Sequence, residues 1–186
     1  MPERVCPWWL GYWLASPVRK WISEDPQKLL APYVRPGMTV LEPGPGMGFF
    51  TLPIARLVGP NGRVVALDIQ PKMLQVLERR ARKAGLFSRI ETRIARPDSM
   101  GVKDLAGSVD FALAFAVVHE LPSSESFFTE TAAALKPAAQ LFFAEPAGHV
   151  NTARFQAELK LARHAGLELV SEPRVNHSRA AVLRRR

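Results

Sequence analysis

Short, continuous apolar runs alternate with helix-like segments along most of this chain, and this alternation restricts its fold more than any other feature. Seven strand-like segments, four of them apolar at every residue, occupy residues 38–41, 64–67, 90–95, 111–116, 141–144, 167–170 and 180–183. Strands that are apolar throughout are buried on both faces, which is typical of a mostly parallel sheet covered by helices on both sides. The sequence therefore predicts an α/β fold, a three-layer sandwich around a seven-stranded sheet.

The helical segments carry their own start and stop signals. Pro71 can open a helix whose apolar residues recur at helical spacing as far as Ala81, and Gly85 is a natural end. A helix over residues 49–58 contains Pro53, which is tolerated only near the first turn. These signals place helices between the apolar runs, as parallel strands require.

The two ends of the chain depart from this pattern. Residues 171–179 are too few and too polar for a crossover helix, so the last strand is predicted to be antiparallel. Residues 1–37 hold all four Trp residues. We expect them to form a helical N-terminal extension that packs on the body or covers the active site as a lid, and residues 38–186 to form the main domain.

The most specific motif is the segment VLEPGPGMGF that begins at Val40. An apolar strand ends in Glu42, and glycines recur at positions 44, 46 and 48 before a helix begins. Glycine permits a tight turn and a close approach of the backbone to a ligand, and the helix start offers free N–H groups. The negative charge of Glu42 suits a ligand with an ammonium group better than a pyrophosphate.

A second acid, Asp68, ends the second apolar run twenty residues after Gly48. An acid at this place in a nucleotide-binding βαβ unit accepts hydrogen bonds from ribose hydroxyls, and Ile69 and Gln70 beside it are placed to flank an adenine ring. An NAD-binding protein is the alternative. It would require a third glycine at position 49, where this chain has Phe49.

These motifs resemble those of the class I S-adenosylmethionine-dependent methyltransferases, a Rossmann-like family, and especially its ubiquinone/menaquinone and arsenite methyltransferases. VLEPGPGMG resembles the first family motif and VVALD the second, while VDFALAFAVVHELP and LKPAAQLFFAEP resemble the segments through strands four and five. The similarity covers residues 37–184. It implies S-adenosyl-L-methionine as the cofactor.

The resemblance also assigns cofactor-binding roles. Glu42 and the loop after it would hold the methionine part, Asp68 the ribose, and Asp98 the adenine amino group, whereas Phe115 would lie near the methyl group. The full implied set is Glu42, Gly44, Pro45, Gly46, Gly48, Asp68, Ile69, Gln70, Asp98 and Phe115.

The chain departs from the family pattern in two places. Asp98 lies within Arg96-Pro97-Asp98-Ser99, so its register against the usual adenine-binding acid is open. The usual Lys-Pro-Gly-Gly before strand five reads Lys136-Pro137-Ala138-Ala139, and alanine resists the positive φ that such a turn uses.

Four polar residues follow strands four and five. His119 is the candidate catalytic residue, a general base if the acceptor must lose a proton, and otherwise a structural or substrate-orienting histidine. Glu120 is interpreted as supporting its loop. Glu145 and His149 are either substrate contacts or loop hydrogen bonders, and His164 and His177 are expected at the surface.

Several activities lack their required residues. The (Asn/Asp/Ser)-Pro-Pro-aromatic motif of amino-methylating nucleic-acid enzymes is missing after strand four, and the single cysteine, Cys6, disfavours cytosine-C5 and arsenite methylation. No acidic cluster of the kind used by metal-dependent catechol enzymes occurs, so no metal is expected. A small, apolar or aromatic acceptor is therefore favoured.

The net charge of +8 keeps an RNA-directed methyltransferase open as an alternative, although nucleic acid is not the favoured partner. A cofactor-binding module without activity is a further alternative. No apolar run reaches the ~18–20 residues that span a bilayer. We expect a cytoplasmic monomer or homodimer.

Overall fold

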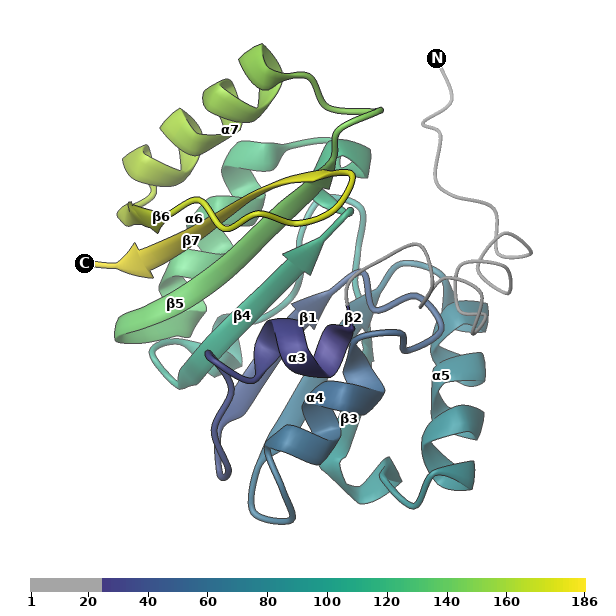
Figure 1. The fold of residues 1–186 in the computed structure, drawn as a ribbon. Helices are drawn as coiled ribbons and strands as arrows, with labels where there is room; N and C mark the ends of the chain where they lie inside the picture. Colours follow the sequence, from purple (N-terminus) through teal and green to yellow (C-terminus); the bar gives the residue numbers. More distant parts are fainter. Residues whose placement is uncertain (1–24) are drawn as a thin grey trace. The chain divides into compact units, whose positions relative to one another are not determined.

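The computed structural model describes residues 25–186, which form two compact units, residues 25–95 and 96–186. The predicted sheet is confirmed, with seven strands that are mostly parallel and an antiparallel last strand (Figure 1). The four Trp residues and Cys6 lie outside the described residues, and so does most of the predicted extension. No helix within residues 25–186 combines the length and the apolar character that crossing a bilayer needs.

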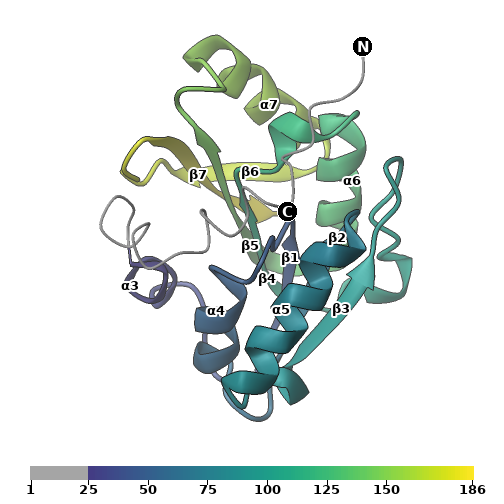
Figure 2. The ribbon, with the colours of Figure 1, turned by 90° about the vertical axis from the view of Figure 1, so that its right-hand side faces the viewer.

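The first unit contains three parallel strands in the order β3-β2-β1. They are β1 (Thr39–Pro43), β2 (Arg63–Asp68) and β3 (Ile90–Ile94). The helices are α3 (Pro26–Leu30), α4 (Thr51–Leu57) and α5 (Pro71–Lys83), and a short turn of helix, η1 (Phe87–Arg89), precedes β3. Helices α4 and α5 connect successive strands (Figure 2).

Helix α5 follows the sequence signals closely. Pro71 occupies its first turn, and the apolar residues at helical spacing through Ala81 are buried. Gly85, with φ of 68°, ends it. Pro53 is the third residue of α4, within the first turn where proline is tolerated.

The second unit contains four strands in the order β4-β5-β7-β6. They are β4 (Val109–Phe115), β5 (Leu135–Pro146), β6 (Leu167–Ser171) and β7 (Ser178–Arg185). The helices are η2 (Lys103–Leu105), η3 (Val118–Glu120), α6 (Ser124–Ala134) and α7 (Thr152–His164). Strands β4 and β5 are parallel, and β7 runs antiparallel to both β5 and β6, between them.

Strand β5 begins earlier than predicted and contains an irregularity. Val109 pairs with Leu135, but Phe111 pairs with Gln140, so four residues of β5 lie opposite one residue of β4 and the register shifts by three. Within this bulge Ala138 has φ of 63°, a left-handed conformation that alanine adopts only at a cost. The chain therefore keeps a positive φ at the place where the resemblance to the family implies glycine.

Aromatic rings join the helices of the second unit to its strands. The rings of Phe143 on β5 and Phe155 on α7 stack with centroids 5.1 Å apart. Phe128 on α6 meets Phe143 edge-on at 5.4 Å. All three side chains are buried, and aromatic pairs of this kind stabilise by about 0.5–1.5 kcal/mol beyond their burial.

Candidate active site

The Gly-rich turn between β1 and α4 uses left-handed backbone at each of its glycines. The φ values are 68° for Gly44, 53° for Gly46 and 86° for Gly48. A Cβ at Gly48 would lie 2.5 Å from Leu77 Cδ1, so Gly48 lets α5 approach the turn. A Cβ at Gly46 would meet no heavy atom of the described chain within 4 Å. Among residues 25–186 nothing covers this side of the Gly46 backbone, so a ligand could approach it there.

Glu42 is a buried carboxylate at the end of β1, and its side chain is almost completely enclosed. Burial raises the pKa of Glu42 from 4.5 to about 7, and the Thr51 hydroxyl opposes this shift. Its Oε2 atom has no hydrogen-bond partner among residues 25–186. A buried oxygen in this state is costly, and a cationic hydrogen-bond donor would compensate for it.

Asp68 ends β2, the strand beside β1, where Glu42 pairs with Ala66 in parallel register. Both acids thus lie near the carboxyl ends of adjacent strands, the edge where open α/β sheets bind ligands. Asp68 Oδ1 accepts a hydrogen bond of 2.9 Å from the Gln70 amide, which shapes the turn into α5. Ile69 lies between Asp68 and Gln70 in this turn, and the side chains of Ile69 and Gln70 are half-buried.

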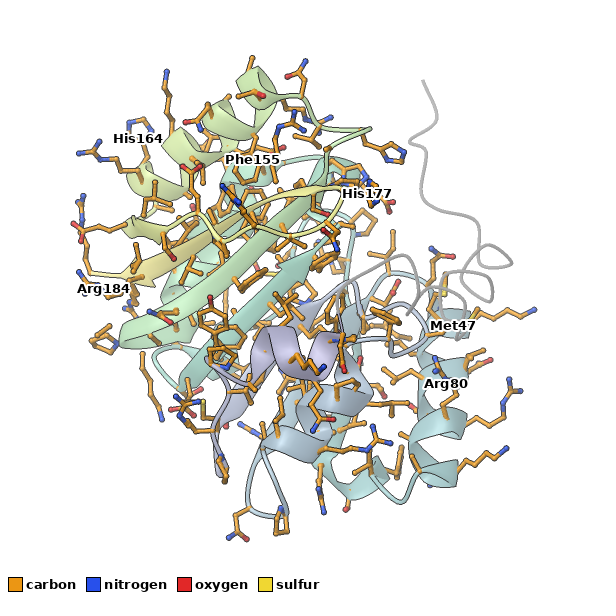
Figure 3. All side chains as sticks on the ribbon, viewed as in Figure 1. Met47, Arg80, Phe155, His164, His177 and Arg184 are labelled. Carbon is orange, nitrogen blue, oxygen red and sulfur yellow. The ribbon has the colours of Figure 1, made fainter. Side chains whose placement is uncertain are left out.

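Arg80 is a residue of this region that the sequence reasoning missed. From α5 its guanidinium donates a hydrogen bond to the Met47 carbonyl within the Gly-rich turn. Figure 3 labels both residues. Partial burial lowers the pKa of Arg80. The only signal in the sequence was its position three residues after Leu77, which places both side chains on one face of α5. Helix α5 therefore contacts the turn through Leu77 and through Arg80.

The remaining implied cofactor residues lie in the second unit. Asp98 is exposed in a tight turn, and Arg96 binds its two oxygens at 3.0 and 2.7 Å. This hydrogen bonding lowers the pKa of Asp98. Phe115 is the half-buried last residue of β4, and Ala116 after it has φ of 58°, a strained value for alanine.

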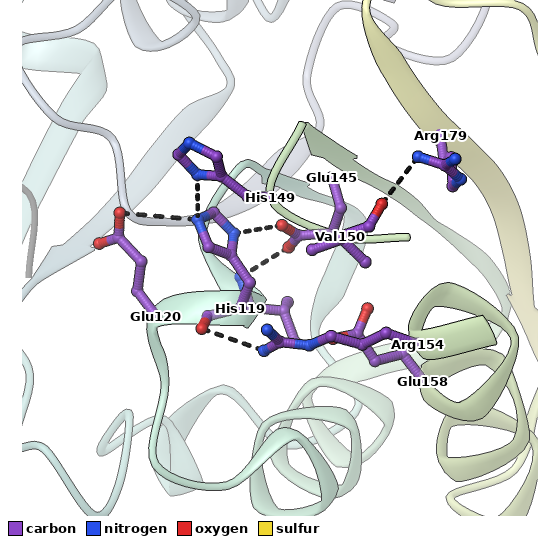
Figure 4. Close-up of polar contacts among 9 residues, drawn as sticks. His119, Glu120, Glu145, His149, Val150, Arg154, Glu158 and Arg179 are labelled. Atoms are coloured by element: carbon purple, nitrogen blue, oxygen red, sulfur yellow. Dashed lines mark hydrogen bonds and ion pairs between the residues drawn. The ribbon is translucent and has the colours of Figure 1, made fainter. Parts of the chain in front are cut away.

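His119 lies on η3, just after β4, and is bound to a buried carboxylate (Figure 4). Its Nδ1 atom is hydrogen-bonded to Glu145 Oε2, and Glu145, near the end of β5, is fully buried. Glu145 Oε1 accepts a 2.8 Å hydrogen bond from the Val118 amide. The hydrogen bond to Glu145 raises the pKa of His119, while partial burial opposes the shift.

Other charged groups surround this pair (Figure 4). His119 Nε2 lies 3.5 Å from His149 Nδ1 and 3.8 Å from Glu120 Oε1. On the other side, Arg154 Nη2 donates to the His119 carbonyl at 3.1 Å, and Arg154 Nε donates to Glu158 at 3.3 Å. His119, Glu120, Glu145 and His149, the four polar residues expected after strands four and five, thus lie together here. Arg154 and Glu158 of α7 join them, and the sequence did not indicate these two.

Two further histidines, His164 and His177, are exposed, as expected (Figure 3). No three His, Cys, Asp or Glu side chains of the described residues form a group that could hold a metal ion.

Comparison with known proteins identifies the family. Residues 35–175 match the family described as methyltransferase domain. An arsenite methyltransferase of Halobacterium salinarum is 29% identical over 126 residues, which cover 68% of this chain and 31% of that protein. The ubiquinone/menaquinone biosynthesis C-methyltransferase UbiE of Pasteurella multocida is 35% identical over 71 residues, 38% of this chain and 26% of the relative. The matched segments thus span about a third or less of these relatives.

The fold has a full-length counterpart among solved structures. A SAM-dependent methyltransferase from Aquifex aeolicus superposes with a TM-score of 0.85 at 24% sequence identity, over 97% of this chain and 99% of that one. At this identity the superposition shows a shared fold. The family itself is shown by the match to the methyltransferase domain, which covers most of the sequence. The chain therefore belongs to the class I, S-adenosylmethionine-dependent methyltransferases.

Proposed function

We propose that this protein transfers the methyl group of S-adenosylmethionine to a small, apolar or aromatic acceptor. The observation that carries the proposal is the buried Glu42 carboxylate beside the Gly-rich turn, with an Oε2 atom that has no partner among the described residues. The methionine part of the cofactor carries an ammonium group, which is the cationic donor that such an oxygen lacks. The buried acceptor oxygen of Glu42 therefore fits the ammonium group of the cofactor.

The other implied residues follow from this placement. The backbone at Gly44 and Gly46, with Pro45 between them, would hold the methionine carboxylate and chain, while Gly48 keeps the turn close to α5. Asp68 would bind the ribose hydroxyls, and Ile69 and Gln70 would flank adenine. Phe115 would lie near the methyl group, and Asp98 would reach the adenine amino group only after giving up a contact with Arg96.

The bound cofactor supplies an electrophilic methyl group. The protein's own part is to hold the acceptor in line with that group and to exclude water. Orientation of this kind can contribute about 7–11 kcal/mol to lowering the barrier. Any proton that the acceptor loses needs a base, and His119 is the proposed one.

Calorimetric titration of S-adenosylmethionine and its demethylated product tests the cofactor site. We expect micromolar binding, about −8 kcal/mol, that Asp68→Ala abolishes. Gly46→Ala should also abolish binding, because its Cβ would enter the space over the turn that residues 25–186 leave uncovered. Gly37→Ala is the matched control, since Gly37 also has a positive φ and no heavy atom of the described chain near its virtual Cβ. Equal affinities for the two glycine variants would refute the assignment of this turn.

An RNA acceptor is the second candidate, and the net charge of +8 favours it. The exposed residues Lys72, Arg79 and Lys83 also place positive charge along α5. Transfer of labelled methyl groups to a bulk RNA preparation, with binding that weakens steeply with salt, would replace the small acceptor by RNA. Cofactor binding without transfer to any acceptor would identify a binding module.

A further inference from the structure

We propose that His119 is a general base, positioned by Glu145, that removes the proton from a hydroxyl group of the methyl acceptor. The enzyme would then be an O-methyltransferase of small hydroxylated molecules. This inference rests on the proposed function and narrows it, because it names the chemical group that receives the methyl.

Glu145 fixes the protonation of the His119 ring. One carboxylate oxygen accepts the Val118 amide at 2.8 Å, and the other is bonded to His119 Nδ1. A buried carboxylate only accepts hydrogen bonds, so Nδ1 must carry a proton. In the neutral ring the lone pair is therefore on Nε2, and that atom can accept a proton.

The ring is also held through its backbone. Arg154 of α7 donates to the His119 carbonyl at 3.1 Å and pairs with Glu158 at 3.3 Å on the next turn of the same helix. Glu158 is itself buried. Strand β5 thus fixes the side chain of His119 and helix α7 fixes its peptide, which is the kind of support that a precisely placed base requires.

The opposite edge of the ring faces polar and partly accessible groups. Nε2 is directed toward His149, which is exposed, and Glu120, which is half-buried (Figure 4). The two ring nitrogens therefore differ in their surroundings: Nδ1 contacts a buried carboxylate, whereas Nε2 faces groups that solvent can reach. A purely structural role for His119 would not require this difference. It is the arrangement of a base whose second nitrogen meets a substrate.

The location agrees with this role. His119 follows the carboxyl end of β4, and Glu145 lies near the carboxyl end of the parallel strand β5. Open α/β sheets bind their ligands at this edge. The same connection contains the strained Ala116, with φ of 58°, and such strain is concentrated at functional sites.

The chemistry that needs such a base is methylation of a hydroxyl. An amine has a lone pair ready to attack, whereas a neutral hydroxyl becomes a good nucleophile only as it loses its proton. The oxygen–carbon bond forms as the carbon–sulfur bond breaks, and the electron pair of the broken bond stays on sulfur. The hydroxyl proton passes to Nε2 of His119, Glu145 stabilises the resulting imidazolium, and the proton then leaves to water past Glu120 and His149.

This role predicts a defined pH dependence. Glu145 and Glu120 raise the pKa of His119, while partial burial and Arg154 lower it. The neutral ring is the active form, so turnover should rise with pH through a value above the 6.5 of an ordinary histidine. The other groups facing the ring are His149 and, behind Arg154, Glu158.

The test uses the full chain with S-adenosylmethionine and umbelliferone, a small aromatic hydroxyl compound whose phenolate fluorescence is lost on methylation. In Glu145→Gln the amide would donate to Nδ1 and leave the proton on Nε2. We expect turnover to fall by about 10²–10⁴-fold, with cofactor affinity unchanged and the acid limb of the pH profile moved to lower pH. Glu130→Gln is the matched control, since Glu130 also accepts a backbone amide, that of Met100 at 3.0 Å, without touching His119.

The outcomes separate the two proposals. If the wild-type protein does not bind S-adenosylmethionine, the proposed function itself fails. If it binds the cofactor but does not methylate umbelliferone, the general-base inference is overturned, while the proposed methyltransferase function stands. Turnover that Glu145→Gln leaves intact, or that Glu130→Gln reduces equally, also overturns it.

Discussion

Replacing Glu42 by Gln should make the protein more stable at alkaline pH while it removes cofactor binding. Burial raises the pKa of Glu42 from 4.5 in the unfolded chain to about 7 in the folded protein. The folded state therefore holds the proton more tightly than the unfolded state. Glutamine has nearly the same shape and carries no charge at any pH.

The sign and the size of the effect follow from linkage. Below pH 4.5 both states are protonated and the Glu42 charge costs nothing. As pH rises toward about 7 the unfolded state loses its proton first, so the free energy of unfolding falls. Each pKa unit corresponds to about 1.4 kcal/mol, which gives a loss of about 3 kcal/mol that persists at higher pH. Glu42→Gln should recover this amount.

Urea unfolding of both proteins at several values between about pH 5 and pH 8 measures the difference directly. The advantage of Glu42→Gln should be small at the acid end and approach ~3 kcal/mol at the alkaline end, equivalent to a Tm increase of roughly 6–12 °C. Glu172→Gln, at an exposed position, should show no such trend. Parallel stability curves for wild type and Glu42→Gln would refute the reasoning, because they would mean that folding does not change the affinity of Glu42 for its proton.

Three further changes test other parts of the structure. Ala138→Gly relieves the left-handed strain at φ of 63° and should raise the unfolding free energy by ~0.5–1 kcal/mol in urea unfolding, whereas Ala139→Gly should lower it. Arg80→Gln removes the hydrogen bond to the Gly-rich turn and should weaken calorimetric S-adenosylmethionine binding about tenfold. His119→Gln should lower the free energy of unfolding below pH 6.5, because the protonated ring of the wild type pairs with Glu145 there. This loss should shrink as pH rises through the raised pKa of His119, and urea unfolding at each pH would measure it.

The sequence predicts this fold well because its signals are local. The spacing of apolar residues after Pro71, and the glycine at position 85, define α5 without reference to any other segment. Continuous apolar runs likewise mark strands that are buried on both faces. The antiparallel last strand followed from the length of one connection.

Long-range features could not be predicted in this way. Nothing near Arg80 in the sequence indicates that its guanidinium binds the Met47 carbonyl, 33 residues away. Glu158 lies on an otherwise ordinary helix, and its burial depends on how α7 packs. The pairing of His119 with Glu145 requires the register of β4 against β5, which shifts by three residues at a bulge.

The cofactor assignments differ in how far the structure bears on them. Glu42 and Asp68 lie at the ends of adjacent parallel strands, as the motifs predicted. Their roles in binding stay predictions until the titrations are made. The motifs leave the register of Asp98 open, and the structure shows its two oxygens bound by Arg96.

The position of β7 between β5 and β6 has a consequence for how the chain is made. Ribosomal synthesis produces β5 and β6 before β7, so during synthesis the β5 edge has no strand to pair with. An unpaired edge of apolar strand is prone to association with other chains. The sheet of the second unit can therefore be completed only when β7 has emerged. A deletion that removes β7 should produce an aggregating protein rather than a slightly shorter folded one.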